Sequence, residues 1–339
     1  MRVWIPGHGI FHQEPPYRRA VYDAQPYRTM NAVLHKSEIL GLDVELANVC
    51  NLKCPLCLSQ LVGNFMQKND SRVFLDIGYL IGELDQMPGL KKLSIAGDAS
   101  EPTLHPELFR LLDYAKDRKE LFVELYTNAS CHLEKYWRDL AAHFSGNSVI
   151  YFTICGSTQE LHGKYRVGSN LDTVLRNARA FKSASPYPND RMQYIKFEYN
   201  RSDDMDAVMN ILKGFSQWGF VETDPIWERL HLDDNSDNGG ICSTRVFAFM
   251  YKRALRAAKS KAKRNILCNS FDEKYVRMDA FGRYSPCVCY LLHRPEDAMK
   301  DGKIDYSDIL QDKCGFCYEC DSEVVEFLSK NERDSFYVC

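Results

Sequence analysis

Short apolar segments and stretches with helical periodicity alternate along residues 42–227, and this alternation restricts the chain to few folds. The apolar segments have the length of buried strands, and the stretches between them repeat apolar residues with the period of a helix. Such alternation predicts a parallel sheet with helical crossovers. Six units would form an open (β/α)6 barrel and eight a complete one. Five units are evident and a sixth ends in a weaker strand, so we expect an α/β fold built on a partial (β/α)6 TIM-like barrel.

The expected elements can be placed by residue number. We expect strands at residues 42–47, 90–96, 121–126, 148–154, 194–199 and 219–227, and helices at residues 76–87, 106–118, 132–144, 171–183 and 203–217. Pro106 suits the first turn of its helix and Asp203 suits an N-cap. Functional groups in such folds gather at the carboxyl ends of the strands.

The segments that flank this core differ from it in composition. Residues 1–41 contain several prolines and aromatic residues, and we interpret them as an N-terminal arm before a core at residues 42–230. Residues 231–265 predict a polar linker and a helix with a basic end, which is either solvated or binds a phosphate-bearing ligand. Residues 266–339 hold many of the cysteines and show little apolar periodicity. We expect metal clusters to cross-link this small C-terminal domain.

Bulk composition excludes several classes of protein. The formal net charge of −3 gives no general attraction to nucleic acid or to a membrane surface, so neither partner is expected. The sequence has no apolar run of about 18 residues and no signal peptide at its start, which predicts a cytoplasmic protein. Its 13 cysteines are an odd number and are clustered. Because disulfides are rare in a reducing compartment, metal ligation explains the cysteines better.

Three of these cysteines, Cys50, Cys54 and Cys57, directly follow the first expected strand with the spacing C-x3-C-x2-C. Iron–sulfur clusters normally take four thiolates. Three close thiolates would leave one iron of a [4Fe–4S] cluster open to another ligand, and an open iron can take part in chemistry. The same spacing can also occur by chance or bind zinc.

Segments at the ends of the next strands lie in an order that resembles the radical S-adenosylmethionine (SAM) superfamily. Residues 97–106, Gly-Asp-Ala-Ser-Glu-Pro-Thr-Leu-His-Pro, resemble the family's Gly-Gly-Glu-Pro segment with extra residues between glycine and glutamate. Residues 126–129, Tyr-Thr-Asn-Ala, resemble Thr-Asn-Gly, and Arg166-Val167-Gly168 resembles a later Arg-x-Gly. On the fifth expected strand, period 2 places Lys196, Glu198 and Asn200 on one face.

The resemblance implies a set of SAM-binding residues. In relatives these segments receive the methionine amino group, the methionine carboxylate and the ribose, and a fixed guanidinium fork suits the carboxylate. Each residue also has a plain structural alternative, such as a turn, a loop cap or an ion pair. The implied contacts are Gly97, Asp98, Ser100, Glu101, Thr127, Asn128, Arg166, Glu198 and Asn200.

The resemblance also implies a mechanism. SAM chelates the open iron, one electron cleaves it, and the resulting 5′-deoxyadenosyl radical abstracts hydrogen from the substrate. A flavodoxin- or ferredoxin-type protein would supply the electron. At the end of the fourth strand, Cys155 stands where relatives often have an acidic residue. It is either a hydrogen donor to a substrate radical or a small buried apolar residue.

The cysteine-rich tail resembles a more specific extension. Cys268, Gly282 and Cys287 have the spacing C-x13-G-x4-C, and Cys314-x2-Cys317 follows, as in the SPASM or shorter Twitch extension that holds auxiliary iron–sulfur clusters. A strand pair around residues 278–284 would form its hairpin. We expect one auxiliary [4Fe–4S] cluster on these four cysteines. A second cluster that also uses Cys320 and Cys339, or a zinc site, is the alternative.

The substrate is the least determined part of this prediction. A compact Twitch-type enzyme suits a small polar molecule, such as a sugar, an aminocyclitol or a nucleotide sugar, for oxidation, epimerisation or decarboxylation. Peptide-modifying relatives often carry a peptide-binding domain ahead of the barrel, and residues 1–41 are too short for it. A maturase of a ribosomal peptide and a non-catalytic iron–sulfur electron carrier are the alternatives.

Overall fold

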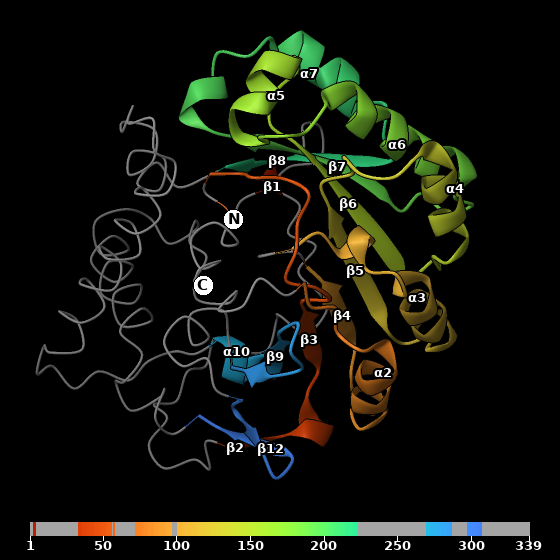
Figure 1. The fold of residues 1–339 in the computed structure, drawn as a ribbon, viewed down its shortest axis with the longest axis vertical. Helices are drawn as coiled ribbons and strands as arrows, with labels where there is room; N and C mark the ends of the chain where they lie inside the picture. The colour runs from red at the N-terminus through yellow and green to blue at the C-terminus, as the bar shows by residue number, and fades with distance from the viewer. Residues whose placement is uncertain are drawn as a thin grey trace, which may run out of the picture.

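A computed structural model of the 339-residue chain describes residues 3–4, 33–55, 57, 72–96, 100–222, 269–286 and 297–306. Its main feature is one nine-stranded sheet with the order β1-β8-β7-β6-β5-β4-β3-β9-β10 (Figure 1). The helices α2, α3, α4 and α6 lie along one side of this sheet. The chain therefore has the α/β fold that the sequence predicts.

The centre of the sheet is a run of parallel strands in sequence order. Each neighbouring pair from β3 to β8 is parallel, including β7 with β8, so the sixth repeat that the sequence shows only weakly is confirmed. This is the strand arrangement of an open (β/α)6 barrel. The six strands are β3 (Gly41–Val44), β4 (Lys92–Ile95), β5 (Phe122–Thr127), β6 (Ser148–Ile154), β7 (Asp190–Lys196) and β8 (Gln217–Glu222).

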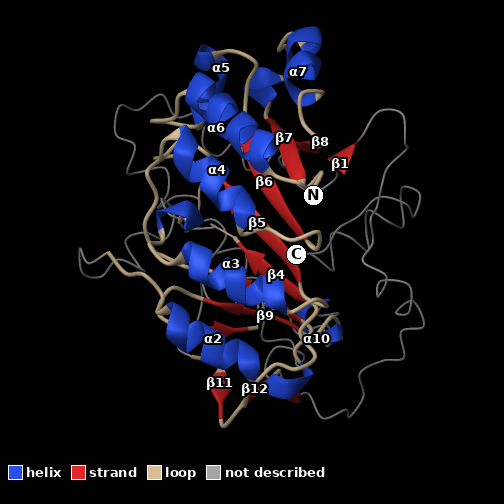
Figure 2. Cartoon of the chain, turned by 90° about the vertical axis from the view of Figure 1, so that its right-hand side faces the viewer, coloured by secondary structure: helices blue, strands red, loops and turns tan. Residues whose placement is uncertain are grey.

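Helices connect these strands and cover one face of the sheet (Figure 2). Side-chain caps begin several of them: Asp76 accepts from the backbone of Tyr79, and Asn170 from that of Thr173. The helices are α2 (Ile77–Asp85), α3 (Leu108–Asp117), α4 (Glu134–Ala142), α5 (Gln159–Tyr165), α6 (Leu171–Ala184) and α7 (Met205–Leu212).

The hydrophobic core lies between the sheet and these helices. On β5, Val123 and Leu125 belong to this core, and Trp137 of α4 packs edge-to-face on Phe152 of β6. Both aromatic rings are fully buried. Burying such a side chain stabilises the fold by roughly 1.5–3 kcal/mol. The alternate residues of the same strands point to the opposite face of the sheet, and many of them are polar.

Several local expectations are wrong, and side-chain contacts explain why. The helix after β4 starts at Leu108 rather than at Pro106, because the His105 ring accepts a hydrogen bond from the Glu107 backbone and holds a turn there. Asp204 caps α7 in place of Asp203. The Asp203 carboxylate instead accepts from the Tyr194 hydroxyl at 2.6 Å.

Two further elements differ from the sequence prediction. Helix α5 was not expected, although Thr158 is a good cap residue and its hydroxyl accepts from the Leu161 backbone. Strand β7 ends at Lys196, and Glu198–Asn200 form a 3-10 turn. Glu198 and Asn200 therefore do not share a strand face with Lys196, which corrects the period-2 argument.

The edges of the sheet come from the two ends of the chain. The expected hairpin is present: β9 (Tyr275–Met278) pairs antiparallel with β10 (Tyr284–Ser285) after the short helix α10 (Asn269–Asp272). Strand β9 also pairs in parallel with β3, so the hairpin extends the core sheet. At the other edge, β1 (Val3–Trp4) pairs with β8.

A second, three-stranded sheet joins the arm to the tail. It consists of β2 (Val33–His35), β11 (Met299–Lys300) and β12 (Lys303–Asp305). The predicted arm and tail segments therefore both contribute strands next to the core. The basic helix expected at residues 245–264 lies outside the described residues.

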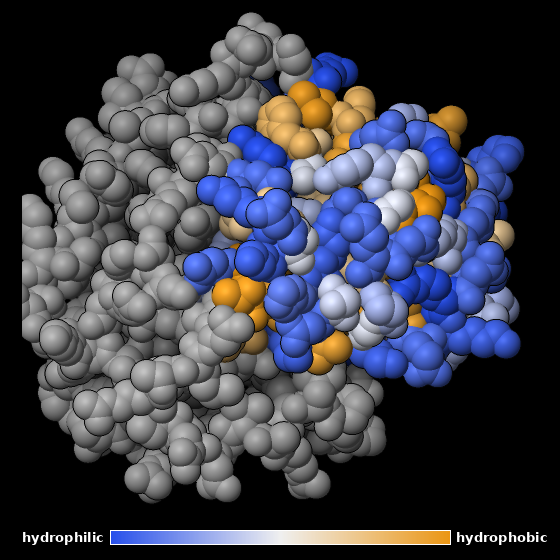
Figure 3. Space-filling view, turned by 90° about the horizontal axis from the view of Figure 1, so that it is seen from below, coloured by the Kyte–Doolittle hydropathy of each residue, from blue (hydrophilic) through white to orange (hydrophobic). Residues whose placement is uncertain are grey.

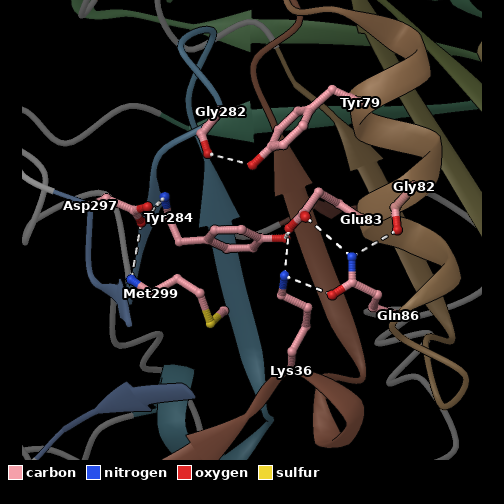
Figure 4. Close-up of polar contacts among 9 residues, drawn as sticks. All are labelled: Lys36, Tyr79, Gly82, Glu83, Gln86, Gly282, Tyr284, Asp297 and Met299. Carbon is pink, nitrogen blue, oxygen red and sulfur yellow. Dashed lines mark hydrogen bonds and ion pairs between the residues drawn. The ribbon is translucent and has the colours of Figure 1, made fainter. Parts of the chain in front are cut away.

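A buried polar network fastens the hairpin to α2 (Figure 4). The Glu83 carboxylate accepts a hydrogen bond of 2.6 Å from the Tyr284 hydroxyl and pairs with the Lys36 ammonium at 2.8 Å. Nearby, one oxygen of Asp297 accepts from the backbone nitrogens of Tyr284 and Met299. Segments from the arm, the first helix and the tail thus share one charged centre.

The described surface seen in Figure 3 is mostly hydrophilic, with apolar side chains in small groups. No helix in the described part of the chain has both the length and the apolarity needed to cross a membrane.

Candidate active site

The loop after β3 carries the three-cysteine motif and is tied to neighbouring strands. The Glu101 backbone nitrogen donates to Val49 at 2.9 Å, and Lys53 donates to the Val167 carbonyl at 3.0 Å. These bonds place the motif between the segments that follow β4 and α5. The thiol of Cys50 accepts from the Leu52 backbone at 3.4 Å. This loop lies at the carboxyl ends of the parallel strands, where enzymes of this fold class carry out their chemistry.

The three thiols are held in a partly buried environment. Cys54 is buried, and Cys50 and Cys57 are half-buried. Burial raises the pKa of Cys50 to about 12 and that of Cys54 to about 11, so both are neutral thiols that must lose a proton to bind iron. No group of three possible ligands in the described residues could hold a single metal ion. The cysteines of a [4Fe–4S] cluster each bind a different iron, so they need not converge on one point.

Glu101 links the ends of β4 and β5. It is 2% exposed, and its Oε1 accepts from the hydroxyls of Thr103 and Thr127, both at 2.6 Å. Its Oε2 accepts from the Asn128 backbone nitrogen at 2.8 Å. The carboxylate is therefore directed toward protein donors, and it shapes the loops that the sequence assigns to SAM. The Thr127 hydroxyl is thus directed toward the Glu101 carboxylate.

Asn128 reaches from the end of β5 to the cysteine loop. Its amide nitrogen donates to Asn51 Oδ1 at 3.0 Å and to the Cys50 sulfur at 3.7 Å. Its amide oxygen accepts from the hydroxyl of Ser130 at 2.6 Å. The fold therefore brings Asn128 and the first cysteine together, as their shared edge of the sheet predicts.

Arg166 lies at the end of α5 and points back to β6. It donates to the Thr153 hydroxyl at 2.5 Å, and its charge lowers the pKa of the Cys54 thiol, opposing the larger effect of burial. Its Nε is buried and has no hydrogen-bond partner within the described part of the chain. A buried guanidinium with a free donor next to the cysteine loop is suited to an anionic ligand group.

Cys155 and Asn200 lie together at the end of β6. The Cys155 side chain is fully buried, and burial raises its pKa while Arg166 acts in the opposite direction. The Asn200 amide donates to the carbonyl of Cys155 at 2.9 Å, so Asn200 supports the backbone of β6. The His162 ring accepts from the Cys155 backbone nitrogen at 3.3 Å. The hydrogen-donor role of Cys155 stays a prediction.

Other predicted residues are not gathered into the site or lie outside the described residues. Glu198 is exposed on its 3-10 turn and pairs with Arg201 at 3.0 Å. Ser100 is buried, and its hydroxyl donates to Glu45 at 2.8 Å. The remaining predicted residues lie outside the described ranges: Gly97, Asp98, Cys268, Cys287, Cys314, Cys317, Cys320 and Cys339.

Sequence reasoning missed a polar layer on the sheet face opposite the helices. Tyr126, Tyr151 and Arg191 are registered neighbours on β5, β6 and β7. The two tyrosine rings stack with centroids 4.3 Å apart, and the Arg191 guanidinium lies 5.0 Å from the Tyr151 ring. Both tyrosine hydroxyls donate to Glu124, at 3.1 and 3.3 Å. The polar residues that alternate with apolar ones in β5 were the signal that could have revealed this layer.

The residues present fit a SAM-binding iron–sulfur site. Three thiols stand on one loop, an amide nitrogen contacts one of them, and a buried guanidinium atom lacks a partner among the described residues. Cys50, Cys54 and Cys57 would hold the cluster, and Arg166 and Asn128 would contact SAM. The cluster of such a site needs thiolate ligands, and the carboxylate of SAM needs a cationic partner such as a guanidinium.

Comparison with known proteins agrees with the family resemblance seen in the sequence. The radical SAM superfamily profile matches residues 44–198. A stretch of 95 residues is 33% identical to 7,8-dihydro-6-hydroxymethylpterin dimethyltransferase of Methanocaldococcus jannaschii. This match spans 28% of this chain and 18% of that protein. Residues 44–198, just under half of the chain, therefore resemble the radical SAM superfamily, whose members use SAM and a [4Fe–4S] cluster.

Two solved structures of Streptococcus suis SuiB are similar in fold. The structure bound to S-adenosylmethionine gives a TM-score of 0.50 at 15% identity and covers 75% of this chain and 61% of SuiB. The structure bound to the precursor peptide SuiA gives a TM-score of 0.53 at 17% identity and covers 87% of this chain and 74% of SuiB. At such identities the likeness concerns the fold alone.

Proposed function

We propose that this chain is a radical SAM enzyme that removes a hydrogen atom from a small polar molecule of the sugar, aminocyclitol or nucleotide-sugar class. The observation that carries the proposal is the polar layer of Glu124, Tyr126, Tyr151 and Arg191, which lies on the sheet face opposite the helices. These groups are hydrogen-bonded to one another, Arg191 also donates to Gln217 at 3.0 Å, and Glu124 pairs with Lys92 at 2.9 Å, so the layer is a charged and polar surface. A ligand rich in hydroxyl groups can exchange hydrogen bonds with such a surface, whereas an apolar ligand would gain no hydrogen bond in return for the water that it displaces.

The residues of the site have separate roles in this proposal. Arg166 and Asn128 orient SAM against the cysteine loop, while Glu101 holds the ends of β4 and β5 in register. When bound, the cluster and SAM supply a 5′-deoxyadenosyl radical for hydrogen abstraction. The buried surroundings exclude water from this step. Oxidation, epimerisation and decarboxylation are all open to such a substrate radical.

The proposal is tested with the anaerobically reconstituted enzyme, SAM and dithionite. A panel of deuterated hexoses, aminocyclitols and nucleotide sugars is compared with a panel of synthetic peptides. We expect a polar small molecule to stimulate 5′-deoxyadenosine formation and to transfer deuterium to it. The Cys50→Ala/Cys54→Ala/Cys57→Ala variant is the control and should give neither. Deuterium transfer from a peptide alone would overturn the substrate class.

Two other reactions are outcomes of the same experiment. The SuiB structure with a precursor peptide has the same fold, so a ribosomal peptide is the second substrate class. The Methanocaldococcus relative is named as a dimethyltransferase. Formation of S-adenosylhomocysteine together with a methylated substrate would therefore indicate methyl transfer instead of oxidation or epimerisation.

We also propose one auxiliary [4Fe–4S] cluster on Cys268, Cys287, Cys314 and Cys317, with a flavodoxin- or ferredoxin-type reductant. Support comes from the hairpin of β9 and β10, which lies between the first two of these positions as in SPASM and Twitch extensions. Iron counting tests the cluster. Cys268→Ala and Cys314→Ala should each lower the iron content by about four atoms per chain. Unchanged iron would defeat the proposal.

A further inference from the structure

We propose that Arg277, in the tail hairpin, is a positioning residue for SAM that acts through Glu45 on the loop containing Ser100 and Glu101. The inference rests on the SAM site proposed above. It assigns to the tail a role in cofactor binding that does not depend on an auxiliary cluster. Four residues, Arg277, Glu45, Ser100 and Glu101, form one chain of contacts from β9 to the cysteine loop.

Glu45 is the centre of this chain. It follows β3, is 2% exposed, and is held in place by a backbone bond of 2.9 Å from its nitrogen to the Met278 carbonyl. One carboxylate oxygen accepts from the Arg277 guanidinium at 3.1 Å, and the other accepts from the Ser100 hydroxyl at 2.8 Å. A carboxylate buried this deeply is stable only with a charged partner and full hydrogen bonding.

Arg277 supplies that charge from a distant part of the sequence. It is 232 positions from Glu45 in the chain, and its side chain is 4% exposed. It lies opposite Asp43 in the parallel register of β9 with β3, and it contacts the Asp43 carboxylate at 3.4 Å. One guanidinium thus pairs with two carboxylates, Asp43 in β3 and Glu45 directly after it, which suits its planar fork.

Ser100 transmits the position of Glu45 to the SAM loop. The next residue, Glu101, donates its backbone nitrogen to Val49, directly before Cys50. Its carboxylate also fixes Asn128, whose amide contacts the Cys50 sulfur. If Arg277 is removed, Glu45 loses its charge partner and must turn toward water, which releases Ser100. The loop that begins at Ser100 then loses its anchor on the side of β3.

We therefore expect Arg277→Met to weaken SAM binding by about 10- to 100-fold, the usual effect of losing a residue that supports a ligating group. Iron bound by the three-cysteine motif should be unchanged, because no cysteine loses a contact. Arg277→Lys keeps the charge near Glu45 and should restore much of the affinity. Ser100→Ala should weaken SAM binding, and adding it to Arg277→Met should have little further effect, because both act along one chain.

The experiment measures SAM binding directly on the reconstituted, reduced enzyme. The change that SAM causes in the electron paramagnetic resonance spectrum of the cluster is titrated to give Kd, and iron per chain is counted in the same samples. Arg283→Met is the matched control, because it removes an arginine–carboxylate pair with Asp279 from the same hairpin and leaves Arg277, Glu45 and Ser100 themselves unchanged.

The outcomes separate this inference from the proposed function. If the wild-type enzyme shows no SAM-dependent spectral change, the SAM site itself fails. If wild type and Arg283→Met bind SAM and Arg277→Met binds it equally well, the role of Arg277 is overturned. If Arg277→Met does not fold, Ser100→Ala decides: normal SAM affinity in that variant overturns the proposal. Additive effects of Ser100→Ala and Arg277→Met would also overturn it.

Discussion

Replacing Glu101 with glutamine tests whether this residue holds the loops of the site or contacts SAM directly. The substitution keeps the shape of the side chain but replaces one acceptor oxygen with an NH2 group. The remaining oxygen can still serve the Thr103 and Thr127 hydroxyls. The NH2 group then faces the Asn128 backbone nitrogen, which now donates at 2.8 Å to Oε2 and would lose its partner.

The cost follows from these contacts. A buried backbone N–H left without an acceptor costs about 1–3 kcal/mol. Loss of the charge on the other hydrogen bonds adds about 1 kcal/mol, since charge-assisted bonds are roughly twice as strong as neutral ones. At about 2 °C for each kcal/mol in a domain of this size, Glu101→Gln should lower Tm by about 4–8 °C. Glu107→Gln, which breaks an exposed pair with Arg110, is the control and should change Tm by at most about 1–2 °C.

Calorimetry on the anaerobic protein, with and without SAM, provides the assay. The reasoning predicts a lower Tm for Glu101→Gln in the absence of SAM. A Tm within about 1 °C of wild type, combined with loss of the rise in Tm that SAM causes, would refute it. That result would mean that the carboxylate binds the ligand and does not hold the loops together.

Three further predictions concern stability. Tyr284→Phe should reduce the free energy of unfolding, measured in urea, by about 1.5–3 kcal/mol, because Glu83 loses a charged hydrogen bond of 2.6 Å. Tyr79→Phe removes only a bond of 3.4 Å to the Gly282 carbonyl and should cost less than about 1 kcal/mol. Burial, followed by the charge of Arg166, lowers the pKa of His162 from 6.5 to about 4. As the pH falls, the unfolded chain therefore takes up a proton at His162 before the folded protein does, and the free energy of unfolding should fall by about 3 kcal/mol between pH 6.5 and pH 4. Tm measured against pH tests this, because His162→Gln should flatten the fall. An unchanged slope would contradict the assignment to His162. Trp137→Ala should cost about 3–5 kcal/mol in the same urea experiment, and Leu133→Ala, at 80% exposed, should be close to neutral.

Local sequence determined much of the scaffold and the order of the site. Strand Ser148–Ile154 has the bounds that its apolar run predicts, and the motifs around Cys50, Glu101 and Asn128 follow successive parallel strands. Parallel strands bring their carboxyl ends to one edge, so motif order along the chain becomes proximity in space. For this reason the family resemblance and the proximity of Cys50 to Asn128 could be predicted before any contact was known.

Contacts between distant residues were decided by the tertiary structure alone. Asp203 accepts from Tyr194 instead of capping a helix, and Arg277 reaches Glu45 across 232 positions. Periodicity and capping rules describe neighbours within a few residues, whereas a buried carboxylate is governed by whichever donor the fold brings close to it. The sequence alone thus predicted the loop at which we propose the radical chemistry, and the packing of β9 against β3 determined which distant residues support that loop.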